Sequence, residues 1–215
     1  VAGALGAAPG EVFFTSGGTE ADNWALKSGA RLRSARGRHI ISTAIEHHAV
    51  LHSLEALAEE GFEVTLLPVD PDGLLRLEDL ERALRDDTIL VSCMFANNEI
   101  GTVQPVAEIG ALCRARDILF HTDAVQAVGH LPIDVVAMNI DLLALSGHKF
   151  HAPKGVGALY VRRGIDLPPF VDGGKQERGR RAGTEAVPAI VGLGAAAELA
   201  TAHFEREAAR VAALR

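Results

Sequence analysis

The chain has 215 residues, of which 48% are hydrophobic and 23% charged, and its formal net charge is −7. This length and composition are typical of one globular domain with a sizeable buried core. Because acidic and basic residues are spread along the sequence and the balance is acidic, no basic surface predicts binding to nucleic acid or to an anionic membrane.

Seven short β-rich runs recur along the chain, and most are separated by amphipathic helical segments. The predicted strands cover residues 11–15, 39–43, 63–69, 88–95, 118–121, 141–146 and 156–161. This alternation predicts an α/β fold with a mainly parallel seven-stranded sheet and helices on both faces. Residues 146–156 leave no room for a crossover helix, so we expect the last strand to run antiparallel to its predecessor and the sheet to be mixed.

The two ends of the chain resemble parts of helices. Residues 1–6 lack an initiator methionine and resemble the tail of a helix, while residues 187–215 form one long helical pattern. We therefore expect a piece of a longer protein. Before the last helix, residues 164–184 are rich in Gly, Pro and Arg, and an ordered loop of that length is usually functional.

The cysteines and the apolar runs bear on the compartment. Cys93 and Cys113 lie in apolar or helical surroundings outside any Cys-x-x-Cys pair, which predicts reduced thiols in a cytoplasmic protein. No apolar run approaches the ~20 residues of a membrane span, and the N-terminus does not resemble a signal peptide. The sequence predicts neither a membrane partner nor a metal site.

Four polar clusters follow predicted strands, at the edge where open α/β sheets bind ligands. The first, Ser16-Gly17-Gly18-Thr19, leads into a helix expected to begin near Glu20. Small residues and free helix-start amides favour a phosphate there. Taken singly, a glycine turn with Thr19 capping the helix is the better interpretation.

The next three clusters supply side chains that could contact such a ligand. His47 or His48 could cover it from the start of a helix, or simply cap that helix. Asn98 could orient polar atoms. Asp123 follows an apolar strand, where a buried carboxylate needs a partner, and Gln126 lies three residues further on. Asp123 as the cap of the next helix is an equally good interpretation.

Lys149 follows the sixth predicted strand in the stretch LSGHKFHAPKG. A lysine is usually a surface charge, but in a partly desolvated cleft it can act as a nucleophilic amine or a base. An anion cradle, a carboxylate, a stacking imidazole and a lysine would converge on one edge of one sheet. This combination fits pyridoxal phosphate, which needs a lysine for its aldehyde, a carboxylate for its ring nitrogen and a cradle for its phosphate.

Several ordered motifs resemble those of one enzyme family. They are FTSGGTEADN, EHHAV, NNEIGTVQPV, TDAVQAVGHLPIDV, SGHKF with PKGVGALYVRRG, and ERGRRAGTEAVP. Together they resemble the class V aminotransferase family, specifically the NifS/IscS-like cysteine desulfurases, over nearly the whole chain. The resemblance implies the large domain of a pyridoxal-phosphate-dependent transferase, with an aspartate aminotransferase-like fold.

The resemblance also implies a role for each matching residue. Lys149 would bind the cofactor covalently and act as base, Asp123 would pair with the ring nitrogen, and His47 would stack on the ring and shuttle protons; these three are the predicted catalytic residues. Gln126 would bind the ring hydroxyl oxygen, with Asn98 beside it. The implied phosphate ligands are Gly18, Thr19, Ser146 and His148, with Thr184 reaching the phosphate of a partner subunit, which implies a homodimer.

The implied reaction converts L-cysteine to L-alanine and delivers persulfide sulfur to an acceptor or scaffold protein, for iron–sulfur clusters or thio-modification. The family's catalytic cysteine and its carboxylate-binding arginine lie C-terminal to the matched region. Residues 1–215 would then be a cofactor-binding large domain without the N-terminal segment and the small C-terminal domain. The alternatives are a selenocysteine lyase or a class V aminotransferase, and a non-catalytic scaffold with the same fold.

Overall fold

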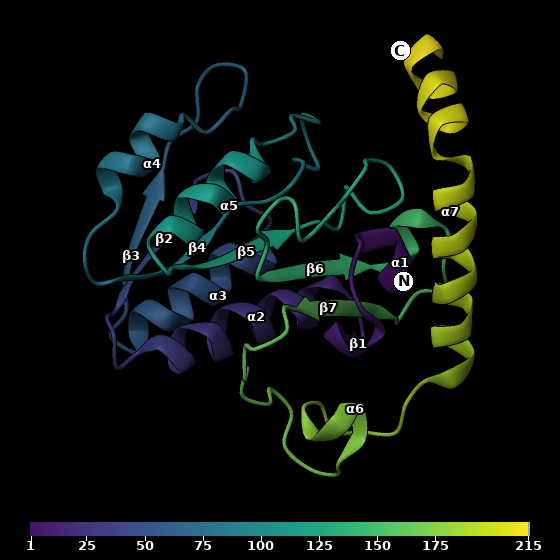
Figure 1. Ribbon diagram of the computed structural model, residues 1–215, viewed down its shortest axis with the longest axis horizontal. Helices are drawn as coiled ribbons and strands as arrows, with labels where there is room; N and C mark the ends of the chain where they lie inside the picture. Colours follow the sequence, from purple (N-terminus) through teal and green to yellow (C-terminus); the bar gives the residue numbers. More distant parts are fainter. Residues whose placement is uncertain (215) are drawn as a thin grey trace.

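A computed structural model describes residues 1–214. All seven predicted strands are present, each within three residues of its predicted bounds (Figure 1). They are β1 (Val12–Thr15), β2 (His39–Thr43), β3 (Glu63–Leu67), β4 (Thr88–Ser92), β5 (Leu119–Asp123), β6 (Leu142–Ser146) and β7 (Gly157–Val161). The predicted seven-stranded α/β fold is therefore confirmed.

The strands form one mixed sheet in the order β1-β7-β6-β5-β4-β2-β3. Neighbouring strands from β6 to β3 run parallel, and β7 runs antiparallel to both β6 and β1. The predicted direction of the last strand is confirmed. Because β7 alone is reversed, the carboxyl ends of the other six strands lie along one edge of the sheet.

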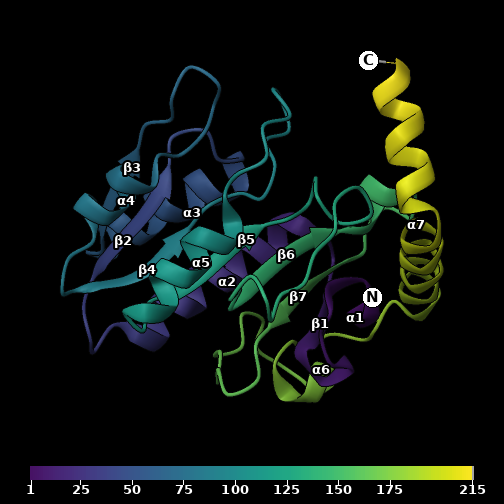
Figure 2. The same ribbon diagram turned by 45° about the horizontal axis from the view of Figure 1, so that its top comes forward.

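Helices cover both faces of the sheet, as predicted (Figures 1 and 2). The helices α2 (Gly18–Arg33) and α3 (His48–Glu59) lie on one face, and α4 (Leu77–Ala83) and α5 (Val106–Ala115) on the other. Strand side chains alternate between the two cores: Leu142 packs with α2, whereas Leu143 packs in the cluster that includes α5. A strand buried on both sides is therefore mainly apolar, as residues 142–145 of β6 are.

The loop before the last helix is ordered by its contacts with the edge strand β1. It contains one short helix, α6 (Gln176–Gly179), in which two residues adopt left-handed backbone angles. The Glu177 carboxylate accepts a hydrogen bond from the Phe14 amide, and the Arg178 guanidinium lies 4.1 Å from the centre of the Phe13 ring. These contacts cover an edge that would otherwise expose unpaired backbone groups.

The last helix, α7 (Val187–Leu214), stands across the carboxyl end of β6 beside the short N-terminal helix α1 (Ala2–Leu5) (Figure 2). The residue Arg215, which was also predicted to be helical, lies outside the described residues. Leu193, Ala196 and Ala197 are buried against the body, but other large apolar side chains of α7 are exposed.

The prediction that no segment is apolar enough to span a membrane is wrong for α7. By length and composition alone this helix could cross one. The reason is its run of Val, Leu and Ala, in which Glu198 is the single charged residue before Glu205. No more than length and composition supports a membrane role.

Candidate active site

A cavity of about 260 Å³ opens at the carboxyl ends of β5 and β6, beside the first turn of α2. Nine of the ten predicted cofactor-binding residues line it: Gly18, Thr19, His47, Asn98, Asp123, Gln126, Ser146, His148 and Lys149. Thr184 is exposed and does not line this cavity. The fold thus brings together residues that are up to 131 positions apart, because their strands end at one edge.

The first turn of α2 forms one wall of the cavity. The helix begins at Gly18 rather than near Glu20, and its N-cap Gly17 has no side chain to cap the first amides. The interpretation of Thr19 as a cap is therefore wrong. A Cβ at Gly18 would lie 2.6 Å from Val125 Cγ2, so any larger residue at this position would clash with the Val125 side chain. The uncapped amides and the positive end of the helix dipole suit a phosphate.

Ser146 and His148 extend this wall from the end of β6. The Ser146 hydroxyl and the Nδ1 of His148 lie 2.9 Å apart and share a hydrogen bond. Ser146 is buried, whereas His148 is exposed. A hydroxyl and an imidazole side by side with free helix amides form a donor set that matches the oxygens of a phosphate.

Asp123 is the last residue of β5, and its side chain is only 5% exposed. One carboxylate oxygen accepts a hydrogen bond from the Val125 amide at 2.9 Å. Burial, reinforced by the nearby carboxyl of Asp22, raises the pKa of Asp123 to about 7. A buried acid beside a second acid is stabilised by a cation, and the protonated ring nitrogen of pyridoxal phosphate would supply one.

His47 is both a helix cap and a cavity residue, so both interpretations of it apply. It is the N-cap of α3, and its Nδ1 accepts a hydrogen bond from the Ala49 amide at 3.1 Å. That bond orients the ring and leaves the other nitrogen unengaged by the cap. His48 does not line the cavity. At the mouth, the Asn98 side chain donates to the carboxylate of the neighbouring Glu99.

Lys149 lies in a short 3-10 helix, η2 (Gly147–Phe150), that directly follows β6. Its carbonyl oxygen accepts a hydrogen bond from His130 Nε2 at 3.1 Å, which ties this turn to the neighbouring loop. The turn ends at His151 in the left-handed conformation, with φ of +70°. Lys149 lines the cavity but is exposed, so within this chain it stands at the open side.

Sequence reasoning missed four residues that also line the cavity: Asp22, Met94, Ala96 and Val125. Asp22 was present in the quoted motif FTSGGTEADN, four residues after Gly18. Positions i and i+4 share one face of a helix, so a helix starting at Gly18 would have pointed to it. The other three are apolar residues without a chemical signal.

Together, the residues fit pyridoxal phosphate. A glycine-lined helix start would suit the phosphate, a buried acid that needs a cation would suit the ring nitrogen, and a lysine lines the same cavity. These are the three groups that this cofactor requires from a protein.

Glu46 is a further buried acid, next to His47 in the chain. Its Oε1 accepts hydrogen bonds from the Thr43 hydroxyl (2.7 Å) and the Met94 amide (2.8 Å), while Oε2 is buried without a hydrogen-bond partner among the described residues. Burial raises the pKa of Glu46 from 4.5 to about 8. Folding therefore favours the protonated carboxyl.

This acid gives the free energy of unfolding a definite pH dependence. Between about pH 5 and pH 8 the unfolded chain binds fewer protons than the folded one, so stability falls as pH rises, by about 1.4 kcal/mol per pH unit for one such group. We expect Glu46→Gln to remove that part of the slope, measured by urea unfolding of the full-length apoprotein. The exposed Glu59→Gln is the control, and an unchanged slope in Glu46→Gln would contradict the assignment.

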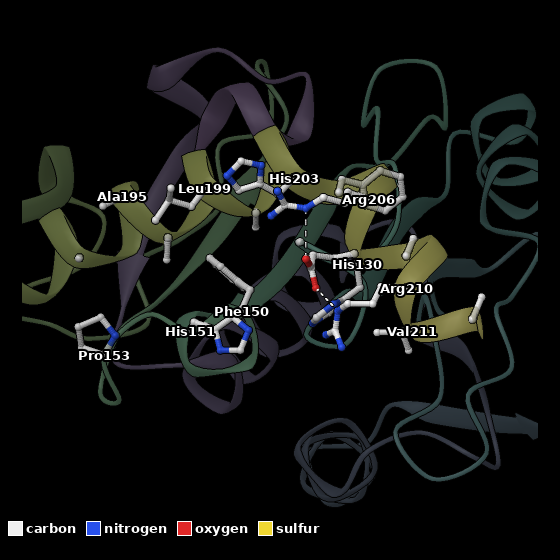
Figure 3. Close-up of a pocket in the computed structure, with 18 residues that line it drawn as sticks. His130, Phe150, His151, Pro153, Ala195, Leu199, His203, Arg206, Arg210 and Val211 are labelled. Atoms are coloured by element: carbon white, nitrogen blue, oxygen red, sulfur yellow. Dashed lines mark hydrogen bonds and ion pairs between the residues drawn. The ribbon is translucent and has the colours of Figure 1, made fainter. Parts of the chain in front are cut away.

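A second and larger hollow, of about 930 Å³, lies between α7 and the segment from Gly129 to Pro153 (Figure 3). Phe150, Pro153, Leu199 and Val211 line it, and Glu207 pairs with Arg206 and Arg210 at one end. Its walls are mainly apolar, and one of them is α7, a helix that is largely exposed. It therefore has the character of a packing surface, and the smaller cavity is the candidate active site.

Comparisons with known proteins show the family to which the chain belongs. The family model described as aminotransferase class-V matches residues 1–215. A protein named cysteine desulfurase IscS from Methanosarcina thermophila is 61% identical over 204 residues, which are 95% of this chain and 50% of the relative. A protein of the same name from Clostridium botulinum (strain Kyoto / Type A2) is 57% identical over 215 residues, 100% of this chain and 54% of the relative. The chain thus spans about half the length of these curated relatives.

Solved structures show the same likeness. One, named NifS-like protein, superposes with a TM-score of 0.92 at 45% sequence identity. The match covers 95% of this chain and 57% of the chain of that structure. Another, named SspA in complex with cysteine, gives a TM-score of 0.89 at 47% sequence identity. That match covers 92% of this chain and 58% of the chain of that structure. At these identities the likeness extends beyond the fold to the sequence.

Proposed function

Because this chain belongs to the class-V aminotransferase family, we propose that the whole protein is a pyridoxal-phosphate-dependent cysteine desulfurase. It would convert L-cysteine to L-alanine and pass the sulfur on as a persulfide. The observation that carries the proposal is the single cavity in which Lys149, Asp123 and the uncapped start of α2 meet. The names of the relatives, and the similar structure of SspA in complex with cysteine, support the substrate.

Each residue has a distinct task in this chemistry. When bound, pyridoxal phosphate acts as an electron sink for the carbanion formed at the substrate Cα. Lys149 would anchor the cofactor, and its free Nζ would take the proton from that carbon. Asp123 would keep a proton on the ring nitrogen. The α2 amides, Ser146 and His148 would hold the phosphate, and His47 would cover the ring.

A thiol that accepts the sulfur is a further requirement. Cys93 and Cys113 are both buried, and burial raises the pKa of Cys113 to about 12 and that of Cys93 well above its usual range. Neither thiol can act as an exposed thiolate nucleophile. We propose that the catalytic cysteine, and an arginine for the substrate carboxylate, belong to the part of the protein beyond this large domain.

The same proposal gives the large hollow a function. A small C-terminal domain would cover the apolar groove between α7 and the segment from Gly129 to Pro153, since the curated relatives are about twice as long as this chain. The exposed Val187, Val191 and Leu199 of α7 would be covered in the whole protein as well.

Further proposals concern assembly and partners. We propose a homodimer in which Thr184 reaches the phosphate of the partner subunit, and a sulfur acceptor or scaffold protein for iron–sulfur clusters or thio-modification. Thr184 is exposed and lies outside the cavity of its own chain, which leaves it free to contact a phosphate bound by a partner subunit. The two free cysteines support a reducing compartment such as the cytoplasm.

Substrate profiling of the full-length protein tests the function. With L-cysteine and a reductant, we expect alanine and sulfide in equal amounts. Faster release of selenium from L-selenocysteine, without turnover of cysteine, would instead indicate a lyase. Transamination without sulfur release would indicate an aminotransferase, and no turnover by cofactor-loaded protein would indicate a scaffold; any of these three results would overturn the proposal.

A further inference from the structure

Two buried polar atoms face each other beside the candidate active-site cavity. Asp22 of α2 is 1% exposed and His121 of β5 is fully buried. Asp22 Oδ1 lies 3.4 Å from His121 Nε2, and neither atom has a hydrogen-bond partner among the described residues. A buried polar atom without a partner is costly, so two such atoms in reach of each other indicate a shared proton.

The contacts of this pair lead from the interior of the sheet to the cavity. The other ring nitrogen of His121, Nδ1, lies 2.9 Å from the Ser92 hydroxyl on β4. Asp22 lines the cavity, as does Asp123, and the charge of Asp22 acts on Asp123. Residues 121 and 123 also lie on the same face of β5, because side chains alternate along a strand. The pair is therefore adjacent to the group proposed to bind the ring nitrogen.

The buried acids around Asp123 lack enough nearby positive charge for more than one of them to be ionised at low cost. Three acids, Asp22, Glu46 and Asp123, and one base, His121, are buried here, with His47 at the cavity surface. Burial raises the pKa of Asp22 to about 8 and lowers that of His121 to about 4. Both shifts favour a neutral pair, in which the Asp22 hydroxyl donates to Nε2 and the Nδ1–H donates to the Ser92 hydroxyl.

We propose that Asp22 and His121 are positioning residues that hold one proton between them as a neutral pair, so that Asp123 remains the only anion facing the ring nitrogen of the cofactor. The inference rests on the proposed function, since it assigns Asp123 to that nitrogen. Asp22 and His121 themselves take no part in the bond changes; they act through Asp123.

Cofactor affinity of the full-length apoprotein, titrated by visible absorbance, tests the pair. His121→Leu removes the Nε2 that accepts the proton of the Asp22 carboxyl. The Asp22 carboxyl should then donate to Asp123 instead, which makes Asp123 a weaker partner for the ring nitrogen. The affinity for pyridoxal phosphate should fall about tenfold, within the range of coupling energies found in shared networks. Asp22→Asn should stay within about threefold, because its amide can still donate to Nε2. The double variant Asp22→Leu/His121→Leu should bind more tightly than His121→Leu alone.

A matched control lies between the two functional residues of β5. Thr122 is fully buried, and its hydroxyl has no partner among the described residues, but it points to the opposite face of the sheet. Thr122→Val should leave cofactor affinity unchanged. If His121→Leu has no larger effect than Thr122→Val, or if the double variant binds the cofactor no more tightly than His121→Leu, the pair is not a unit and the proposal is wrong.

A second measurement needs neither cofactor nor a variant that folds poorly. Nitrogen-15 NMR of histidine-labelled apoprotein should show the His121 ring neutral from about pH 5 to pH 8, with its proton on Nδ1. A doubly protonated ring at neutral pH would overturn the proposal. Because this readout uses the wild-type apoprotein, it separates failure of the pair from failure of the proposed function, which would appear as a wild type that does not bind pyridoxal phosphate.

Discussion

Replacing Lys149 with alanine is expected to lower the desulfurase activity of the full-length protein by more than about 10³-fold, the scale seen when a covalent catalytic residue is removed. The structure supports this because Lys149 is the one lysine that lines the candidate active-site cavity among the described residues. Without its amine, the protein loses both the covalent anchor and the base that accepts the Cα proton. The visible absorbance of the lysine-bound cofactor should disappear at the same time.

Lys154 provides the matched control for this experiment. It lies five residues further along the same loop, is exposed and does not line the cavity. Lys154→Ala should therefore retain the absorbance and nearly full activity. A Lys149→Ala protein that keeps the wild-type spectrum, or a wild type that stays colourless after addition of pyridoxal phosphate, would reject the assignment of the cofactor to this cavity.

Replacing Asp123 with asparagine is expected to lower kcat by about 10²–10³-fold, the usual loss when one preorganised electrostatic contact is removed. Asparagine keeps the shape and can still accept the hydrogen bond from the Val125 amide. It lacks the negative charge that would keep a proton on the ring nitrogen, so the cofactor would withdraw electrons less strongly. Because Lys149 is intact, visible absorbance should remain while turnover with L-cysteine falls.

Asp141 separates this effect from a general loss of stability. It is a second buried acid in the sheet, at the start of β6, where it pairs with Arg162 and accepts a hydrogen bond from the Phe120 amide. Asp141→Asn should lower the thermal stability while leaving kcat nearly unchanged. If each of the two variants, Asp123→Asn and Asp141→Asn, loses activity only by the fraction of protein that is unfolded, Asp123 has a structural role alone.

Much of the site was predictable because its residues follow strands in a repeating order. An apolar run of about five residues, then a polar cluster, then a helical pattern recurs at β1, β2, β5 and β6. Parallel strands align their carboxyl ends, so Gly18, His47 and Asp123 could be expected at one edge before any distance was known. Nine residues that this pattern predicts or the family resemblance implies line the cavity.

Other features depended on contacts that a local pattern does not contain. The helix α2 starts at Gly18 rather than near Glu20, without a capping side chain, at a position where a Cβ would clash with Val125. The exposed apolar side of α7 was not foreseen, because amphipathic spacing alone does not reveal which face a neighbour covers.

The sequence by itself determined the number of strands, the reversed direction of β7, and which polar residues lie at strand ends, because hydrophobic periodicity and loop length are local properties of the chain. Only the tertiary structure decided that β1 pairs with β7 and that Asp22 lies beside His121 behind Asp123. Those contacts join residues 99 or more positions apart: β1 and β7 pair as neighbouring strands, and Asp22 meets His121 where α2 packs on the sheet. The proton that we assign to this buried pair is accordingly a property of the folded protein.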